Sequence, residues 1–291
     1  MENEPESLNN ENAHEQLYKR PYLAFLDILG FSTLVKENSH ETLVELYDDI
    51  FSKTVQRVDE MMEKLKASKV KEHGEKYIDS GLRIINISDS IIIWTKHGNP
   101  NALFEIVAAT SALMGFSLIR GLPLRGSITR QPFAVKEKGT VTSIIGKGLV
   151  HAYNVEKNQQ WSGCTIDSEI INYFRSIEKL ILNRNRPSPI ERNYLVYEYD
   201  IPIKDKENSS ATKRGFAVNW SDRHITDTMI LNSFEEHNKK DESEETKYKI
   251  EKTIEFHNFC QSELKEREDK EQKLIEAFKE MDNNEKDKYL N

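Results

Sequence analysis

Two aspartates, Asp27 and Asp89, carry the clearest chemical signal in this chain. Asp27 interrupts the apolar stretch "YLAFLDILGFSTLV" (22–35), and Asp89 lies between two apolar runs in "GLRIINISDSIIIW" (81–94). Carboxylate oxygens are preferred ligands of hard divalent cations such as Mg²⁺ and Mn²⁺. Two carboxylates that meet can hold two such ions, which together activate a hydroxyl group and stabilise a leaving phosphate.

The residues that follow Asp27 add a second element to this hypothesis. The segment "ILGFS" (28–32) offers backbone N–H groups at a glycine turn that enters a helix, an arrangement typical of phosphate cradles. Each aspartate taken alone is more often a turn former or a helix cap at the end of a strand. The functional interpretation therefore depends on whether the fold brings Asp27 and Asp89 together.

The pattern of the first half of the chain predicts such a meeting. Residues 22–28 read as a buried strand, 40–67 as an amphipathic helix, and 81–94 as a hairpin that turns at Ser88 and Asp89. A buried helix over 100–119, with Gly121 near its C-cap, precedes a strand over 122–129. This β-α-β-β-α-β order predicts an α+β, ferredoxin-like antiparallel sheet, in which the first strand neighbours the hairpin.

The second half of the chain predicts additions to this core. We expect a hairpin over 132–145 with Gly139 near its turn, a helix over 146–161, a strand over 164–167 and a helix over 168–178. Later strands are expected over 193–201 and 214–220. We divide the chain into a disordered tail (1–19), a catalytic domain (20–223) and a charged helical extension (224–291).

Composition limits the classes of function. The net charge of −8 argues against broad nucleic-acid binding. No uninterrupted apolar run reaches the roughly 18 residues of a membrane span, and the acidic N-terminus lacks the apolar core of a signal peptide. Cys164 and Cys260 are the only cysteines, and no pair of the eight histidines has i, i+4 spacing. We therefore expect a cytoplasmic protein without disulfides, zinc or membrane insertion.

Four blocks of the sequence resemble the class III nucleotide cyclases. "FLDILGFS" (25–32) is similar to the family's "F-x-D-I-x-G-F-[ST]" signature, and "ISDSIIIW" (87–94) to its central hairpin. "LRGSIT" (124–129) and "GKGLVHAYNVE" (146–156) echo two further blocks, and together the blocks cover roughly residues 20–170. The resemblance implies a site with two Mg²⁺ or Mn²⁺ ions. In it Asp27, Asp89 and the Ile28 carbonyl would bind the metals, the backbone around Leu29, Gly30, Phe31 and Ser32 would hold phosphate, and Arg125 would contact the triphosphate.

Departures from the family pattern concern the part of the site that reads the base. The helix asparagine and arginine of the family fall on Val150 and Asn154, and the adenine-reading lysine and aspartate fall near Ile85 and Ser143. The chain thus looks most like the pyrimidine cyclases of bacterial Pycsar anti-phage systems. That resemblance implies a homodimer with active sites at the interface, which converts UTP, or CTP, to a cyclic monophosphate that a separate effector senses.

Two other functions remain open on the sequence alone. The replaced helix arginine and asparagine fit a non-catalytic cyclase-homology module that binds a nucleotide or a protein. A purine cyclase with unusual base contacts is the third hypothesis. Tyr47, on the first helix, is expected to pack in the core rather than to touch a base.

Overall fold

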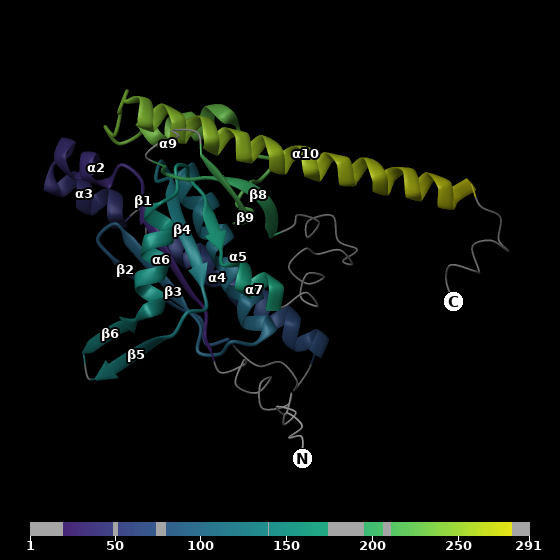
Figure 1. Ribbon diagram of the computed structural model, residues 1–291, viewed down its shortest axis with the longest axis horizontal. Helices are drawn as coiled ribbons and strands as arrows, with labels where there is room; N and C mark the ends of the chain where they lie inside the picture. The colour runs from purple at the N-terminus through teal and green to yellow at the C-terminus, as the bar shows by residue number, and fades with distance from the viewer. Residues whose placement is uncertain are drawn as a thin grey trace, which may run out of the picture.

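The computed structural model describes residues 20–48, 52–73, 80–138, 140–173, 195–205 and 211–280. Within them a single large sheet is packed between helices (Figure 1). The strands of this sheet are β1 (Leu23–Ile28), β2 (Arg83–Ile87), β3 (Ser90–Trp94), β4 (Leu124–Thr129), β7 (Cys164–Ile166), β8 (Val196–Pro202) and β9 (Thr212–Val218). A separate hairpin is formed by β5 (Phe133–Lys138) and β6 (Val141–Gly146).

The strand order of the large sheet is β2-β3-β1-β4-β7-β9-β8. Its first four strands are antiparallel to one another, which confirms the predicted β-α-β-β-α-β core and the α+β class. The sheet has more strands than the predicted core, because β7 pairs with β4 in parallel, β9 pairs with β7, and β8 pairs with β9. The sequence signals of these three strands were present, but their place in the sheet is set by long-range pairing.

Helices cover both faces of the sheet, whereas the expected ferredoxin-like core carries its two helices on one face. The helices are α2 (Phe31–Glu37), α3 (His40–Tyr47), α4 (Lys53–His73), α5 (Pro100–Ile119), α6 (Lys147–Lys157), α7 (Ser168–Tyr173), α9 (Asp227–Glu235) and α10 (Glu244–Glu280). The main core lies on the face of α4 and α5, where Leu26, Ile91 and Ile106 are fully buried. A smaller core around Phe25 and Trp94 lies on the opposite face, under α6 and the β5–β6 hairpin.

Most of the expected elements are present, with differences at charged segments. The helix expected over 40–67 corresponds to α3, which ends at Tyr47, and α4, which begins at Lys53, while residues 49–51 between them lie outside the described residues. Residues 68–73, beyond the helix expected to end at 67, continue α4, because lysine and glutamate have favourable helix propensities without an apolar stripe. The tail 1–19, Gly139 and the end of the helix expected over 168–178 lie outside the described residues.

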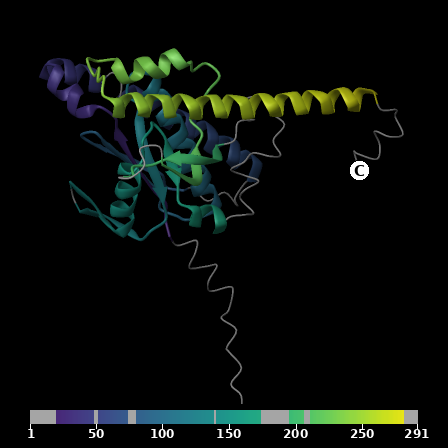
Figure 2. The ribbon, with the colours of Figure 1, turned by 45° about the horizontal axis from the view of Figure 1, so that its top comes forward.

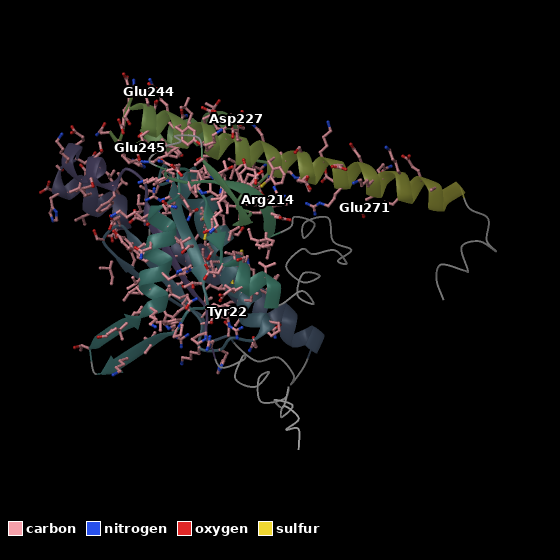
Figure 3. The ribbon with its side chains drawn as sticks, viewed as in Figure 1. Tyr22, Arg214, Asp227, Glu244, Glu245 and Glu271 are labelled. Atoms are coloured by element: carbon pink, nitrogen blue, oxygen red, sulfur yellow. The ribbon has the colours of Figure 1, made fainter. Side chains whose placement is uncertain are left out.

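The C-terminal helices pack on the main core. Phe256 and Cys260 of α10 are buried in it together with Ile230 of α9. Figures 1 and 2 show that the later part of α10 projects well beyond the sheet, and Figure 3 places Glu244 and Glu245 at its packed end and Glu271 on the projecting part.

One helix, α5, is long and apolar enough to span a membrane by length and composition. Its most apolar window is 72% buried inside the molecule, as expected of the central core helix of a folded domain.

Candidate functional site

The pairing of β1 with β3 brings Asp27 beside the turn that carries Asp89. Asp27 lies opposite Ser90 in the antiparallel register, and the Ile28 N–H donates a hydrogen bond of 3.0 Å to the Asp89 carbonyl oxygen. Both aspartates are partly exposed, at the end of β1 that leads into α2. The two aspartates singled out in the sequence therefore lie at the same end of the β1–β3 strand pair.

Arg125 and Glu156 complete a charged cluster around Asp27. Arg125 of β4 lies opposite Asp27, and residues opposite each other in an antiparallel pair point to the same face of a sheet. From α6, which covers that face, Glu156 Oε1 accepts a hydrogen bond of 2.5 Å from Arg125 Nε. The cluster thus contains three carboxylates, Asp27, Asp89 and Glu156, and one guanidinium group, which come from β1, the β2–β3 turn, α6 and β4.

The electrostatics of this cluster favour a bound cation. Burial, followed by the negative charges of Glu156 and Asp89, raises the pKa of Asp27 from 3.8 to about 7, although Arg125 lowers it. Burial also raises the pKa of Glu156, against the opposing effect of Arg125. Carboxylates that repel one another in this way are relieved when a divalent cation binds between them.

The donor set fits a magnesium or manganese site that substrate completes. Within the described ranges, no group of three or more His, Cys, Asp or Glu side chains is arranged to hold a metal ion. The oxygens available are the two carboxylates and nearby backbone carbonyls. Mg²⁺ is commonly bound by one or two carboxylates together with substrate phosphates, so Asp27, Asp89 and the Ile28 carbonyl would hold such an ion.

The predicted phosphate cradle is a tight turn between β1 and α2. Gly30 has φ 79°, a left-handed conformation that glycine adopts without strain, and both Gly30 and Ser32 are exposed. The N–H of Leu29 already donates to the Pro123 carbonyl oxygen at 2.9 Å. Of the four residues expected in the cradle, Leu29 therefore holds the turn in place, whereas Gly30 and Ser32 lie at the surface.

Arg125 differs from the expectation of a residue reaching for phosphate. It is only 7% exposed, and its guanidinium group donates to both Glu156 and the Gln159 carbonyl oxygen, the latter at 3.0 Å. Sequence analysis singled out neither Glu156 nor Gln159 as a partner of Arg125. The partners of Arg125 lie more than thirty positions further along the chain and meet it only through packing of α6 on β4.

A second cation near this cluster, Lys204, was also missed. Lys204 follows β8, and its pKa is lowered by burial and by the charges of Arg125 and Lys249, while Glu245 and Glu156 oppose this effect. Its closest carboxylate is Glu245 at 3.9 Å, at the packed end of α10 (Figure 3). The strand order β7-β9-β8 folds Lys204 back toward Arg125, which a single sequence does not reveal.

The residues of the base-reading positions are spread over α6 and the two hairpins. Val150 is 60% exposed and Asn154 is also exposed, four positions later on α6. Ser143 is exposed on β6, whereas Ile85 of β2 packs against the smaller core. Exposed positions four apart on a helix lie on one side, so Val150 and Asn154 face away from the body of this chain.

Tyr47 does more than fill the core. Its hydroxyl group donates to the carbonyl oxygen of Ser88 and accepts a hydrogen bond of 2.7 Å from Asn86 Nδ2. Burial raises the pKa of this hydroxyl group, and Asp89 raises it further, while the bond from Asn86 opposes the shift. Tyr47 therefore ties α3 to the β2–β3 turn that presents Asp89.

Comparison with family models and with curated proteins gave no match. Among solved structures, the chain is similar to the guanylyl cyclase Cya2, with 11% identity, a TM-score of 0.40, and coverage of 68% of this chain and 89% of that one. A non-canonical dimeric guanylyl cyclase domain of the RhoGC fusion protein from Blastocladiella emersonii has 13% identity and a TM-score of 0.38, with coverage of 55% of this chain and 85% of that one. A monomeric adenylate cyclase from Trypanosoma brucei has 12% identity and a TM-score of 0.34, with coverage of 72% of this chain and 92% of that one. The chain is thus structurally similar, at low sequence identity, to guanylyl and adenylate cyclase domains.

Proposed function

We propose that this protein is a nucleotide cyclase that converts a pyrimidine nucleoside triphosphate, UTP in preference to CTP, to its 3′,5′-cyclic monophosphate and pyrophosphate. The observation that carries the proposal is the juxtaposition of Asp27 and Asp89 across the β1–β3 pair, fixed by the bond from Ile28 N–H to the Asp89 carbonyl oxygen. The resemblance of "FLDILGFS" and "ISDSIIIW" to the class III signatures supports the same reaction.

The residues of the site divide the reaction between them. Asp27 and Asp89 hold the divalent ions, which supply charge neutralisation and acidify the ribose 3′-hydroxyl when bound. The surface amides of the Gly30 turn hold the phosphate tail. The 3′-oxygen attacks the α-phosphorus and its proton passes to solvent, while the bond to the β-phosphate breaks and pyrophosphate leaves.

Arg125 and Lys204 supply positive charge on the phosphate side of the site. Arg125 is held by Glu156, so its main effects are to fix the cluster and to favour the ionised form of Asp27. The Lys204 side chain is held less firmly than that of Arg125, because its Nζ lies 3.9 Å from Glu245 Oε1 and 41% of the side chain is exposed. A triphosphate would relieve the repulsion between these cations.

The active protein is proposed to be a homodimer with sites at its interface. Val150 and Tyr153 of α6 and Ile145 of β6 are exposed by 60%, 42% and 65% on the side of the smaller core. Exposed apolar side chains gathered on neighbouring elements are typical of protein interfaces. The partner's α6 would then close each site, with Val150 and Asn154 facing the substrate.

Pyrimidine choice is proposed on the Pycsar resemblance, and the residues at the base-reading positions argue against adenine. Ile85 and Ser143 provide neither the cation nor the carboxylate that would pair with adenine in the related enzymes. The cytoplasmic location, the role in anti-phage defence and the downstream effector that senses the cyclic nucleotide are proposed on the Pycsar resemblance.

The test is incubation with an equal mixture of the four ribonucleoside triphosphates and Mn²⁺, followed by chromatographic identification of the product. We expect a cyclic pyrimidine monophosphate, no product from Asp27→Ala or Asp89→Ala, and unchanged circular dichroism of both variants. Turnover by either variant at the wild-type rate would remove the two-metal proposal, and a cyclic purine product would overturn the choice of substrate.

A non-catalytic nucleotide-binding module is the second candidate. The observation that favours it is the engagement of Arg125 by Glu156, together with the replacement of the family's helix asparagine and arginine by Val150 and Asn154. This candidate predicts that Mn²⁺ with a nucleoside triphosphate raises the melting temperature without any turnover. Measuring both quantities in one sample distinguishes the two functions.

A further inference from the structure

A buried lysine lies beneath the turn that follows the metal-binding strand. Lys239, in the connection between α9 and α10, is only 2% exposed. A methyl group in place of a Gly30 hydrogen would sit 3.4 Å from Lys239 Cδ, so the lysine stem packs directly on this turn. Figures 1 and 2 both place the α9–α10 connection beside α2.

The ammonium group of Lys239 joins two segments that are far apart in sequence. Its Nζ donates to the Gly121 carbonyl oxygen at 2.5 Å and to the Ser233 carbonyl oxygen at 2.7 Å. Burial lowers the pKa of Lys239 to about 8, with the charge of Glu236 acting against this shift. A buried ammonium is retained only where its protons are bonded, so this contact fixes the α5–β4 turn against the end of α9.

The same connection is tied to α2 and to the α5–β4 turn by other contacts. Asn38, after α2, donates to the His237 carbonyl oxygen at 2.8 Å and accepts a bond of 2.9 Å from Asn238. His237 Nε2 donates to the Arg120 carbonyl oxygen at 2.9 Å. His237 and Asn238 both have φ 60°, an unfavourable conformation for non-glycine residues that persists where surrounding contacts hold it.

These contacts reach the metal-binding end of β1 through the backbone. The Leu29 N–H donates to the Pro123 carbonyl oxygen, two residues after Gly121, and the Ile28 N–H donates to the Asp89 carbonyl oxygen. The end of β1 is therefore held on one side by the turn of Asp89. On the other side it is held by the α5–β4 turn, which Lys239 fixes.

We propose that Lys239 is a positioning residue, through which the C-terminal helices hold the end of β1 and its glycine turn in the geometry that binds metal and nucleotide. The proposal rests on the proposed function and assigns a role to the C-terminal extension. We do not expect Lys239 to contact substrate, because it is buried beneath the Gly30 turn.

The direct test uses hydrogen–deuterium exchange of the nucleotide-free protein. We expect Lys239→Met, which keeps the stem and removes the ammonium, to speed exchange of the Ile28 and Leu29 amides. The Asp167 amide, bonded to the Ile128 carbonyl oxygen at the other end of β4, serves as an internal reference that should not change. The matched control is Lys240→Met, because the Lys240 side chain is 61% exposed and pairs with Glu242 at the surface.

The functional readout is the separation of KM from kcat. Because the turn holds phosphate in both the ground state and the transition state, Lys239→Met should raise KM for the Mn²⁺–nucleotide complex and change kcat less. An increase of roughly two- to thirtyfold corresponds to the usual range of coupling through packed networks. Lys240→Met should behave as wild type in both quantities.

A second variant covers the case in which Lys239→Met does not fold. Asn38→Ala leaves the buried lysine in place and removes the side-chain bonds to His237 and Asn238, so it should give the same effects in smaller measure. Wild-type exchange at Ile28 and Leu29 in both folded variants would overturn the proposal. If wild type neither binds nor cyclises any nucleotide, the proposed function fails, whereas the exchange result still decides whether Lys239 holds the turn.

Discussion

At the scale of single residues, the proposed metal binding depends on the ionisation of Asp27. Its pKa of about 7 in the folded chain lies above the ordinary value of 3.8, chiefly because of burial and then because of Glu156 and Asp89. The folded protein therefore holds this proton more tightly than the unfolded chain does. The resulting stability is present in full below about pH 4 and is lost as the pH rises through about 7.

Asp27→Asn should therefore stabilise the metal-free protein at high pH. The amide removes the partly buried negative charge, so we expect a higher melting temperature than wild type at about pH 8 and a similar one near pH 4. Adding Mn²⁺ should raise the melting temperature of wild type and leave that of the variant unchanged. Identical melting curves of the two metal-free proteins at about pH 8 would contradict the raised pKa.

Glu156→Gln should shift the pH dependence of metal binding. Loss of the Glu156 charge removes one cause of the raised pKa of Asp27, and it also frees Arg125, which favours the ionised carboxylate. The midpoint of Mn²⁺ binding against pH should move below that of wild type, as measured by calorimetric titration across about pH 5 to 8. A midpoint that stays in place or rises would show that Glu156 does not act on Asp27.

At the scale of elements, α6 and the β5–β6 hairpin form the face on which the dimer is proposed. Val150→Glu should place a charge at the centre of this exposed apolar face and yield a monomer without cyclase activity. Light scattering after gel filtration measures the mass. The control is Leu231→Glu, a similarly exposed apolar residue on α9, which should remain dimeric and active. A dimer that survives Val150→Glu would place the interface elsewhere.

The elements also show which parts of the fold were predictable. The strand of Asp27, the hairpin of Asp89 and the helix over 100–119 have strong apolar patterns, and each forms as predicted. The continuation of α4 to His73 lies in a charged segment, where that pattern is weak. The positions of β7, β9 and β8 depend on pairing between distant segments, which local patterns do not encode.

In the candidate site, too, the residues on strongly patterned strands were predictable, whereas contacts between separate elements were not. Asp27 and Asp89 were found because their strands are adjacent in the expected topology, and the structure places them at one edge. The engagement of Arg125 by Glu156, the bond of Leu29 to Pro123 and the approach of Lys204 to Arg125 all arise from packing between separate elements. Such contacts become visible only when the chain is folded.

At the scale of the whole molecule, α10 has two parts with different roles. Phe256 is fully buried among core aromatic rings, whereas Figure 3 shows Glu271 on the part that projects beyond the sheet. Phe256→Ala should lower the free energy of unfolding by about 3–5 kcal/mol, the usual cost of emptying such a site. Deletion of residues 270–291 should change it much less. Denaturant unfolding compares them, and a larger loss from the deletion would contradict this division.

The measurement that tests the central claim most directly is Mn²⁺ binding by electron paramagnetic resonance, in the presence of a 3′-deoxy pyrimidine nucleoside triphosphate that cannot cyclise. We expect two bound ions per protomer in wild type, and loss of this binding in both Asp27→Asn and Asp89→Asn. Wild-type Mn²⁺ binding in either folded variant would show that the two carboxylates do not form one metal site.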